Sequence, residues 1–120
     1  MIKPWIFELF GTPGGRGTTV DPRVTAEHFA WHLDLWRRAE PMGFEGIFFS
    51  EHHFGLGYSP SPNLLIATMA NLTKTLRLGV MGVVLPYYQP WRVVEEIGML
   101  DQLTGGRLEI GTASGIPQGP

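Results

Sequence analysis

Residues 76–111 read LRLGVMGVVLPYYQPWRVVEEIGMLDQLTGGRLEIG, and this stretch contains the pattern that decides the fold. Its segment 76–85 is mostly apolar and has the length of a buried strand. Gln89-Pro90 places a proline where a helix begins, and the apolar stripe that follows ends at Gly105-Gly106. A second short run, RLEIG at 107–111, completes the unit. A strand, a helix and a strand in this order indicate two parallel strands joined by a right-handed crossover.

The same alternation extends back to the N-terminus. Asp21-Pro22 and Ser61-Pro62 each combine a helix-capping residue with a proline in the first turn, and Pro41 limits the first helix to about Glu40. Residues 64–72 are apolar nearly all round, which predicts a well buried helix. The predicted elements are strands at 4–10, 47–50, 76–85 and 107–111, and helices at about 22–40, 62–72 and 90–104.

The order of these elements predicts an α/β fold in a single domain, residues 1–120. Alternation alone does not distinguish an open doubly wound sheet from half of a (β/α)₈ barrel, which needs about 250 residues. In a half barrel the first and fourth strands are unpaired edges. We therefore expect the chain to pair with another copy, to belong to a longer protein, or to be marginally stable alone.

The composition argues against several classes of function. A formal net charge of −2 and the lack of any run of Lys or Arg disfavour nucleic acid as a partner. No cysteine is present, which rules out disulfides and thiolate chemistry. The N-terminus does not look like a signal peptide, and no apolar run reaches the roughly 18 residues of a membrane-spanning helix. We therefore expect a cytoplasmic protein with no membrane partner.

Glu51-His52-His53 follows directly on the predicted strand at 47–50. In both architectures, ligands bind beyond the carboxyl ends of the strands. A carboxylate beside two imidazoles can orient a ring and tune a proton donor or acceptor, so a general acid or base is the functional interpretation. A polar strand end with one histidine bound to backbone explains the spacing equally well. A metal site is less favoured, because adjacent residues of an extended chain point to opposite sides.

Three further features have both a functional and a structural interpretation. His28 and His32 lie four residues apart on the first predicted helix, where we favour ordinary packing over a shared metal. The glycine loop at 11–17 contains Arg16 and could bind a phosphate, but it matches no phosphate-binding pattern. We therefore favour a mobile surface loop or lid. Gly79 and Gly82 either clear space for a flat aromatic ligand or reflect tight packing. The Trp and Phe residues are expected in the core.

Residues 43–54, GFEGIFFSEHHF, resemble the second strand and its exit in bacterial luciferase-like monooxygenases. The similarity continues through LRLG at 76–79, VLP at 84–86 and LDQLTGGR at 100–107, and it covers nearly the whole chain. The combination of EHHF with L-P-x-x-x-P and LDQLTGGR is specific. The chain is thus similar to the N-terminal half of a flavin-dependent monooxygenase of this family.

The resemblance implies a TIM barrel of which roughly the first half, four parallel strands and three helices, is present. It implies that reduced FMN reacts with dioxygen to form a C4a-hydroperoxide, which oxygenates a small organic substrate. His52 matches the catalytic acid or base beside the flavin, with Glu51 and His53 in support. Met81 and Gly82 match the third-strand segment that packs a peptide bond, often cis, against the isoalloxazine ring.

Ala113 and Ser114, after the fourth predicted strand, complete the cofactor-binding candidates. Ser114 stands where the luciferases carry an arginine near the flavin phosphate, a departure from the family pattern. The resemblance also implies a separate flavin reductase as partner, and we expect no metal and a homo- or hetero-oligomer. The alternatives are a deazaflavin-dependent oxidoreductase of the same superfamily, using the deazaflavin coenzyme, and a non-catalytic half barrel.

Overall fold

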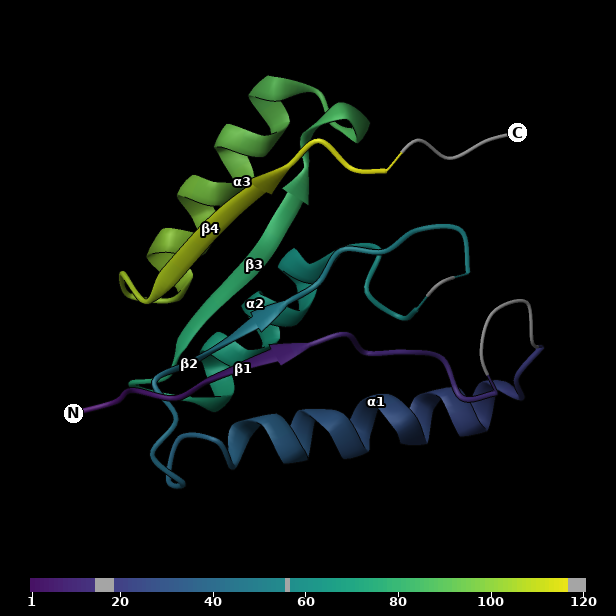
Figure 1. The fold of residues 1–120 in the computed structure, drawn as a ribbon, viewed down its shortest axis with the longest axis horizontal. Helices are drawn as coiled ribbons and strands as arrows, with labels where there is room; N and C mark the ends of the chain where they lie inside the picture. Colours follow the sequence, from purple (N-terminus) through teal and green to yellow (C-terminus); the bar gives the residue numbers. More distant parts are fainter. Residues whose placement is uncertain (15–18, 56, 117–120) are drawn as a thin grey trace.

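The computed structural model describes residues 1–14, 19–55 and 57–116. Within these residues the chain forms one parallel sheet of four strands, in the order β1-β2-β3-β4, with an α-helix between successive strands (Figure 1). The elements are β1 (Trp5–Glu8), α1 (Pro22–Arg37), β2 (Gly46–Phe49), α2 (Pro62–Leu72), β3 (Arg77–Val84), the 3₁₀ turn η1 (Leu85–Tyr87), α3 (Pro90–Leu103) and β4 (Leu108–Ala113). The predicted α/β fold with four parallel strands and three helices is confirmed.

Each of the three α-helices has a proline in its first turn, at Pro22, Pro62 and Pro90. Proline is favourable there because its ring holds a helical φ and its missing N–H has no partner to lose. Ahead of α1, the Asp21 carboxylate accepts a hydrogen bond from the N–H of Arg23 at 2.8 Å. The predicted helix starts are confirmed, although the Ser61 side chain makes no capping hydrogen bond.

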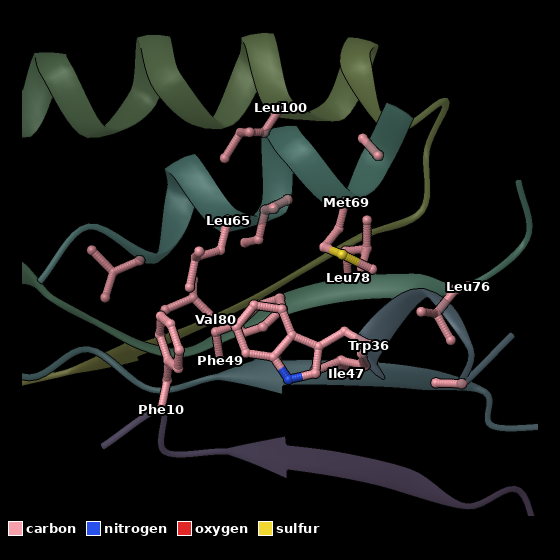
Figure 2. Close-up of a cluster of buried hydrophobic side chains, with 14 residues drawn as sticks. Phe10, Trp36, Ile47, Phe49, Leu65, Met69, Leu76, Leu78, Val80 and Leu100 are labelled. Carbon is pink, nitrogen blue, oxygen red and sulfur yellow. The ribbon is translucent and has the colours of Figure 1, made fainter. Parts of the chain in front are cut away.

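The core lies on the face of the sheet that the helices cover. Ile47 and Phe49 of β2 and Leu78 and Val80 of β3 are all 0% exposed. Their spacing of two residues puts them on the same side of the sheet. Side chains from all three helices complete this cluster, whose largest members include Phe10, Trp36, Leu65, Met69 and Leu100 (Figure 2).

The opposite face of the sheet has no covering element among the described residues. Phe7 and Leu9, in and just after β1, are each 56% exposed. On the same face the rings of Trp5 and Phe48 stack with their centroids 4.7 Å apart. The prediction that the aromatic residues belong to the core is therefore wrong for Phe7, because in the described residues only one face of the sheet meets the helices.

The helices are also less buried than the sequence predicts. In α2, Leu64 is 70% exposed and Leu72 44%, although the helix was expected to be buried all round. Trp31 of α1 and Trp91 of α3 are 62% and 60% exposed. The reason is that each helix contacts the sheet with one side only, so apolar residues on its other side reach the surface. None of the described helices is long and apolar enough to cross a membrane.

Along β3 and β4 the structure decides between two interpretations of Gly79 and corrects the end of the fourth strand. A Cβ on Gly79 would lie 2.5 Å from the carbonyl oxygen of Glu109 and 2.7 Å from the Phe48 ring. Gly79 therefore serves tight packing between strands and leaves no space for a ligand. The fourth strand was expected to end at Gly111, but β4 continues to Ala113, which pairs with Val84.

Two charged side chains hold the connection between α2 and β3 from opposite sides. The Glu40 carboxylate accepts hydrogen bonds from the N–H groups of Lys74, Thr75 and Leu76, at 2.9, 2.8 and 2.8 Å. On the other side, the Arg107 guanidinium donates to the carbonyl oxygen of Leu76 at 3.0 Å. This connection precedes β3, so its position sets where the third strand begins.

Replacing Glu40 with glutamine is expected to destabilise the fold by about 1 kcal/mol at neutral pH, because hydrogen bonds to an ionised acceptor are stronger than neutral ones. Partial burial opposes ionisation of Glu40, but the backbone N–H groups of Thr75, Leu76 and Lys74 outweigh it and lower the pKa below its ordinary value of 4.5. This stabilisation is therefore present above pH 4.5 and is lost as the pH falls through the lowered pKa.

Urea denaturation at several pH values measures this effect. The wild type and Glu40→Gln should differ at neutral pH and converge in acid. Glu27→Gln, a change at an exposed position of α1, is the matched control and should track the wild type throughout. A difference that is independent of pH would contradict the role assigned to the Glu40 charge.

Candidate active site

The carboxyl ends of the four strands lie at the same end of the sheet, toward which all four arrowheads in Figure 1 point. A cavity of about 290 Å³ opens at this end. Every strand or its exit contributes to the lining: Phe7 and Leu9 at β1, Ser50 to His53 after β2, Met81, Gly82, Val84 and Tyr87 at β3, and Ala113, Gly115 and Ile116 at β4. The parallel topology thus brings together residues that are far apart in the sequence.

The Glu51 carboxylate is the most buried charged group of this cavity, with a side chain that is only 1% exposed. One oxygen accepts a hydrogen bond from the Tyr88 hydroxyl at 2.6 Å. The other accepts from the N–H of Val84 at 3.1 Å and from His53 Nε2 at 2.9 Å. Three donors therefore satisfy the carboxylate, and they tie the exit of β2 to the exit of β3.

Tyr88 and His53 are held in turn by this carboxylate. Burial, the hydrogen bond to Glu51 and the negative charge of Glu51 raise the pKa of Tyr88, so its hydroxyl stays protonated and continues to donate. The ring of His53 meets the ring of Tyr87 edge to face, with 4.8 Å between centroids. His53 is thus fixed by a charge on one side and an aromatic ring on the other.

His52 has a different set of partners. Its Nδ1 atom lies 3.0 Å from Ser50 Oγ, and its backbone N–H donates to the carbonyl oxygen of Ser59 at 3.1 Å. The support for His52 that was expected from Glu51 goes to His53 instead. The reason is the two-residue period of extended chain, which puts Ser50 and His52 on one side and Glu51 and His53 on the other.

Met81 and Gly82 form the wall of the cavity on the β3 side. The peptide bond between them is cis, and the pairing of β3 with β4 shifts register between Val80 and Val83. A Cβ on Gly82 would lie 2.9 Å from the backbone carbonyl carbon of Thr112, so the close approach of β4 requires glycine here. Met81 is 52% exposed and presents an apolar surface to the cavity.

The structure brings most of the predicted site residues to one place. The lining includes Glu51, His52, His53, Met81, Gly82 and Ala113. Ser114 is exposed and is not among the lining residues, although its neighbours Ala113 and Gly115 are.

Three residues of the site were missed by sequence reasoning. Ser50 was treated as the end of a strand, and Tyr87 and Tyr88 as part of a connection. A signal for Ser50 exists in the sequence, since it lies two residues before His52 and therefore on the same side of an extended chain. For the two tyrosines, only the folded structure reveals the contacts with His53 and Glu51.

The other candidates lie outside this cavity. His28 Nε2 is 3.2 Å from the carbonyl oxygen of Gly11, and His32 Nδ1 is 2.8 Å from that of His28. Both imidazoles also contact the buried Phe10 ring. These contacts agree with the interpretation of His28 and His32 as packing residues. No three His, Asp or Glu side chains within 1–14, 19–55 and 57–116 are grouped as metal ligands. Residues 15–17 of the glycine loop, including Arg16, lie outside the described residues.

The cavity suits a flat, largely apolar ring system. Met81, Gly82 and Ala113 supply an apolar wall, and the imidazole of His52 supplies a polar group beside it. Small-molecule sites commonly measure roughly 300–1,000 Å³, so this cavity matches a ring system better than a complete nucleotide. In the described part of the chain no Lys or Arg lines it. The residues present therefore fit the isoalloxazine of a flavin and leave its phosphate to other segments.

Comparison with known proteins identifies the family. The family model for luciferase-like monooxygenases matches residues 6–119. The chain is 42% identical over 90 residues to 4-hydroxyprotoasukamycin monooxygenase of Streptomyces nodosus, covering 69% of this chain and 24% of that protein. It is 39% identical over 84 residues to the oxygenase component of the flavin-dependent trigonelline monooxygenase of Acinetobacter baylyi, covering 69% and 23%.

A solved structure agrees with these relatives. The oxygenating constituent of 3,6-diketocamphane monooxygenase from Pseudomonas putida, in complex with FMN, superposes with a TM-score of 0.80 at 26% identity. The match covers 96% of this chain and 30% of that one. The chain thus spans about a quarter of the length of the curated relatives and under a third of the solved structure. With the family model matched over nearly its whole length, the chain belongs to the luciferase-like monooxygenase family.

Proposed function

We propose that this chain forms the cofactor face of a flavin-dependent monooxygenase that oxygenates a small organic substrate. The observation that carries the proposal is the cavity at the strand ends, where an apolar wall adjoins the His52 imidazole. When bound, reduced FMN supplies the electrons that activate dioxygen. The relatives named as monooxygenases and the FMN complex of the similar structure support this assignment.

In this proposal the residues of the chain position the ring and manage a proton. Met81, Gly82 and Ala113 would hold the isoalloxazine. Val84 and Ile116 would add apolar surface around the ring. His52 exchanges a proton with the reacting groups through its Nε2 atom, because its Nδ1 atom is already engaged by Ser50.

The full activity requires surfaces that the described residues do not supply. The edges β1 and β4 and the uncovered face of the sheet are those of an incomplete barrel, and the similar solved chain is about three times as long. We propose that further strands of a longer protein pair with both edges and that their loops hold the phosphate. A second copy of this chain is the other outcome, and size-exclusion chromatography with light scattering distinguishes the two.

The partners follow from the same assignment. A relative described as an oxygenase component implies a companion protein, so we propose that a separate reductase delivers the reduced flavin. Dioxygen and a small organic molecule are the proposed substrates, and the cytoplasm is the proposed location.

Anaerobic titration of the longer protein proposed above with reduced FMN, followed by exposure to air, tests the proposed function. The protein should bind reduced FMN and, after air is admitted, convert part of the flavin oxidation into an oxygenated product from a panel of organic substrates. Peroxide without product, at the yield of free flavin, would contradict the proposal. Tighter binding of the reduced deazaflavin coenzyme would favour the oxidoreductase alternative.

A charge on the proposed ring wall tests the location of the site. Met81→Asp should weaken the binding of reduced FMN roughly tenfold or more, because it places a carboxylate against an apolar ring and a negatively charged cofactor. Met42→Asp is the matched control, since Met42 is an exposed methionine (71%) that does not line the cavity. Equal binding by the two variants would contradict the placement of the ring beside Met81.

A further inference from the structure

We infer that Ser50 is a positioning residue that sets the tautomer of His52, so that the unprotonated Nε2 atom of the imidazole is presented to the cavity. The catalytic consequence of this inference rests on the proposed function, whereas the tautomer itself does not. The single hydroxyl proton of Ser50 determines which tautomer His52 adopts.

The Ser50 hydroxyl donates to the carbonyl oxygen of Leu9 at 3.2 Å. Ser50 is only 2% exposed, so water does not compete for this proton. A hydroxyl has one proton to donate and two lone pairs that accept. Because the Ser50 hydroxyl donates its proton to Leu9, its Oγ atom can only accept a hydrogen bond from His52 Nδ1, which lies 3.0 Å away. Nδ1 therefore carries the proton of the neutral imidazole.

The backbone around His52 is held by the same loop. The N–H of His52 donates to the carbonyl oxygen of Ser59, and the Ser59 hydroxyl donates to the carbonyl oxygen of Ser50 at 2.6 Å. Ser59 thus fixes the main chain, while Ser50 alone contacts the ring. His52 Nε2 has no hydrogen bond within 1–14, 19–55 and 57–116, and the ring lines the cavity.

The neighbouring histidine has the opposite arrangement. His53 Nε2 lies 2.9 Å from a Glu51 oxygen, and a carboxylate that accepts three hydrogen bonds needs a donor there. His53 therefore carries its proton on Nε2 and donates it in a hydrogen bond to Glu51. Of the two adjacent imidazoles, His52 is therefore the one whose Nε2 atom carries the lone pair.

Nitrogen NMR of the protein with ¹⁵N-labelled histidine, recorded without flavin, tests this inference. At alkaline pH, where imidazoles are neutral, we expect His52 to carry its proton on Nδ1. Its signals are assigned by their absence from the His52→Gln spectrum. In Ser50→Ala, the ratio of the two tautomers should shift about fivefold to tenfold toward the Nε2–H form, which is the equilibrium effect of losing one ordinary hydrogen bond.

Two variants separate positioning from simple damage to the fold. Ser50→Thr keeps a hydroxyl and should retain the wild-type tautomer. Ser59→Ala removes a buried hydroxyl from the same loop without touching the His52 ring, and it should also retain that tautomer. A Ser50→Ala spectrum that matches the wild type overturns the inference, and so does a wild-type His52 protonated on Nε2, which is read even where the variant fails to fold. Because no flavin is present, failure of the monooxygenase assignment leaves this result intact.

Discussion

Replacing Arg107 with alanine is expected to lower the free energy of unfolding by about 3 kcal/mol, since hydrogen bonds from a charged group contribute about 1.5–3 kcal/mol each and are not additive. The guanidinium makes four hydrogen bonds, to the carbonyl oxygens of Ala70, Leu76 and Thr104 and to the Thr73 hydroxyl. It therefore joins the ends of two helices to the start of β3.

The position of these acceptors explains the expected size of the effect. Ala70 lies in the last turn of α2, and Thr104 is the residue that follows α3. Carbonyl groups at helix C-termini have no partner within the helix, and a cation there also interacts favourably with the helix dipole. Removing the side chain leaves several partly buried acceptors unsatisfied at once.

Urea denaturation followed by circular dichroism measures the change, and Arg107→Lys serves as the conservative variant. Lysine keeps the positive charge but lacks the planar fork that reaches four acceptors, so it should recover only part of the loss. Arg23→Ala is the matched control, because its side chain is 90% exposed and, among the described residues, makes a single ion pair, with Asp21 at 3.6 Å. Equal midpoints for Arg107→Ala and Arg23→Ala would contradict the structural role of Arg107.

The fold could be predicted because the sequence signals for its strands and helices are local. Apolar runs of strand length, prolines in first turns and glycines after helices repeat along the chain, and each is a property of a few neighbouring residues. Once the strands are known to be parallel, their carboxyl ends must share an edge. That argument alone places Glu51 and Met81, which are 30 positions apart in the numbering, at the same cavity.

The contacts that stabilise the fold could not be predicted in this way. Glu40 and Arg107 both bind the connection before β3. The residues next to them in the sequence do not indicate that residues 73–76 are their partners. The exposure of Phe7 was missed for a related reason. A short apolar run predicts burial on both faces of a parallel sheet, whereas in the described residues only one face is covered.

The site lies between these two cases. The pairing of Ser50 with His52 follows from strand alternation and was available in the sequence, although its use requires knowing that the extended conformation continues past the end of β2. The contact between Tyr88 and Glu51 depends on how the segment after η1 returns toward β2, which is a property of the whole fold. Sequence reasoning thus identifies the His52 imidazole but not all of the groups that contact the site.

Replacing His52 with glutamine is expected to reduce the yield of oxygenated product by about 100-fold or more, the range typical for removal of a general acid or base. Glutamine has a similar size and keeps hydrogen-bonding capacity, so the cavity should retain its shape. Binding of reduced FMN should change little, because the proposed ring wall is formed by Met81, Gly82 and Ala113 rather than by the imidazole. Product analysis after exposure to air, together with the anaerobic binding titration, measures both quantities.

The split between binding and turnover is what identifies His52 as a proton-transfer group. If the histidine served only to shape the cavity, flavin affinity and product yield would fall together. If it moves a proton, peroxide should accumulate in place of product, because flavin oxidation by dioxygen continues without productive transfer. His28→Gln, a change outside the cavity that keeps a donor toward Gly11, should behave as the wild type. Unchanged product formation by His52→Gln would remove this residue from the mechanism.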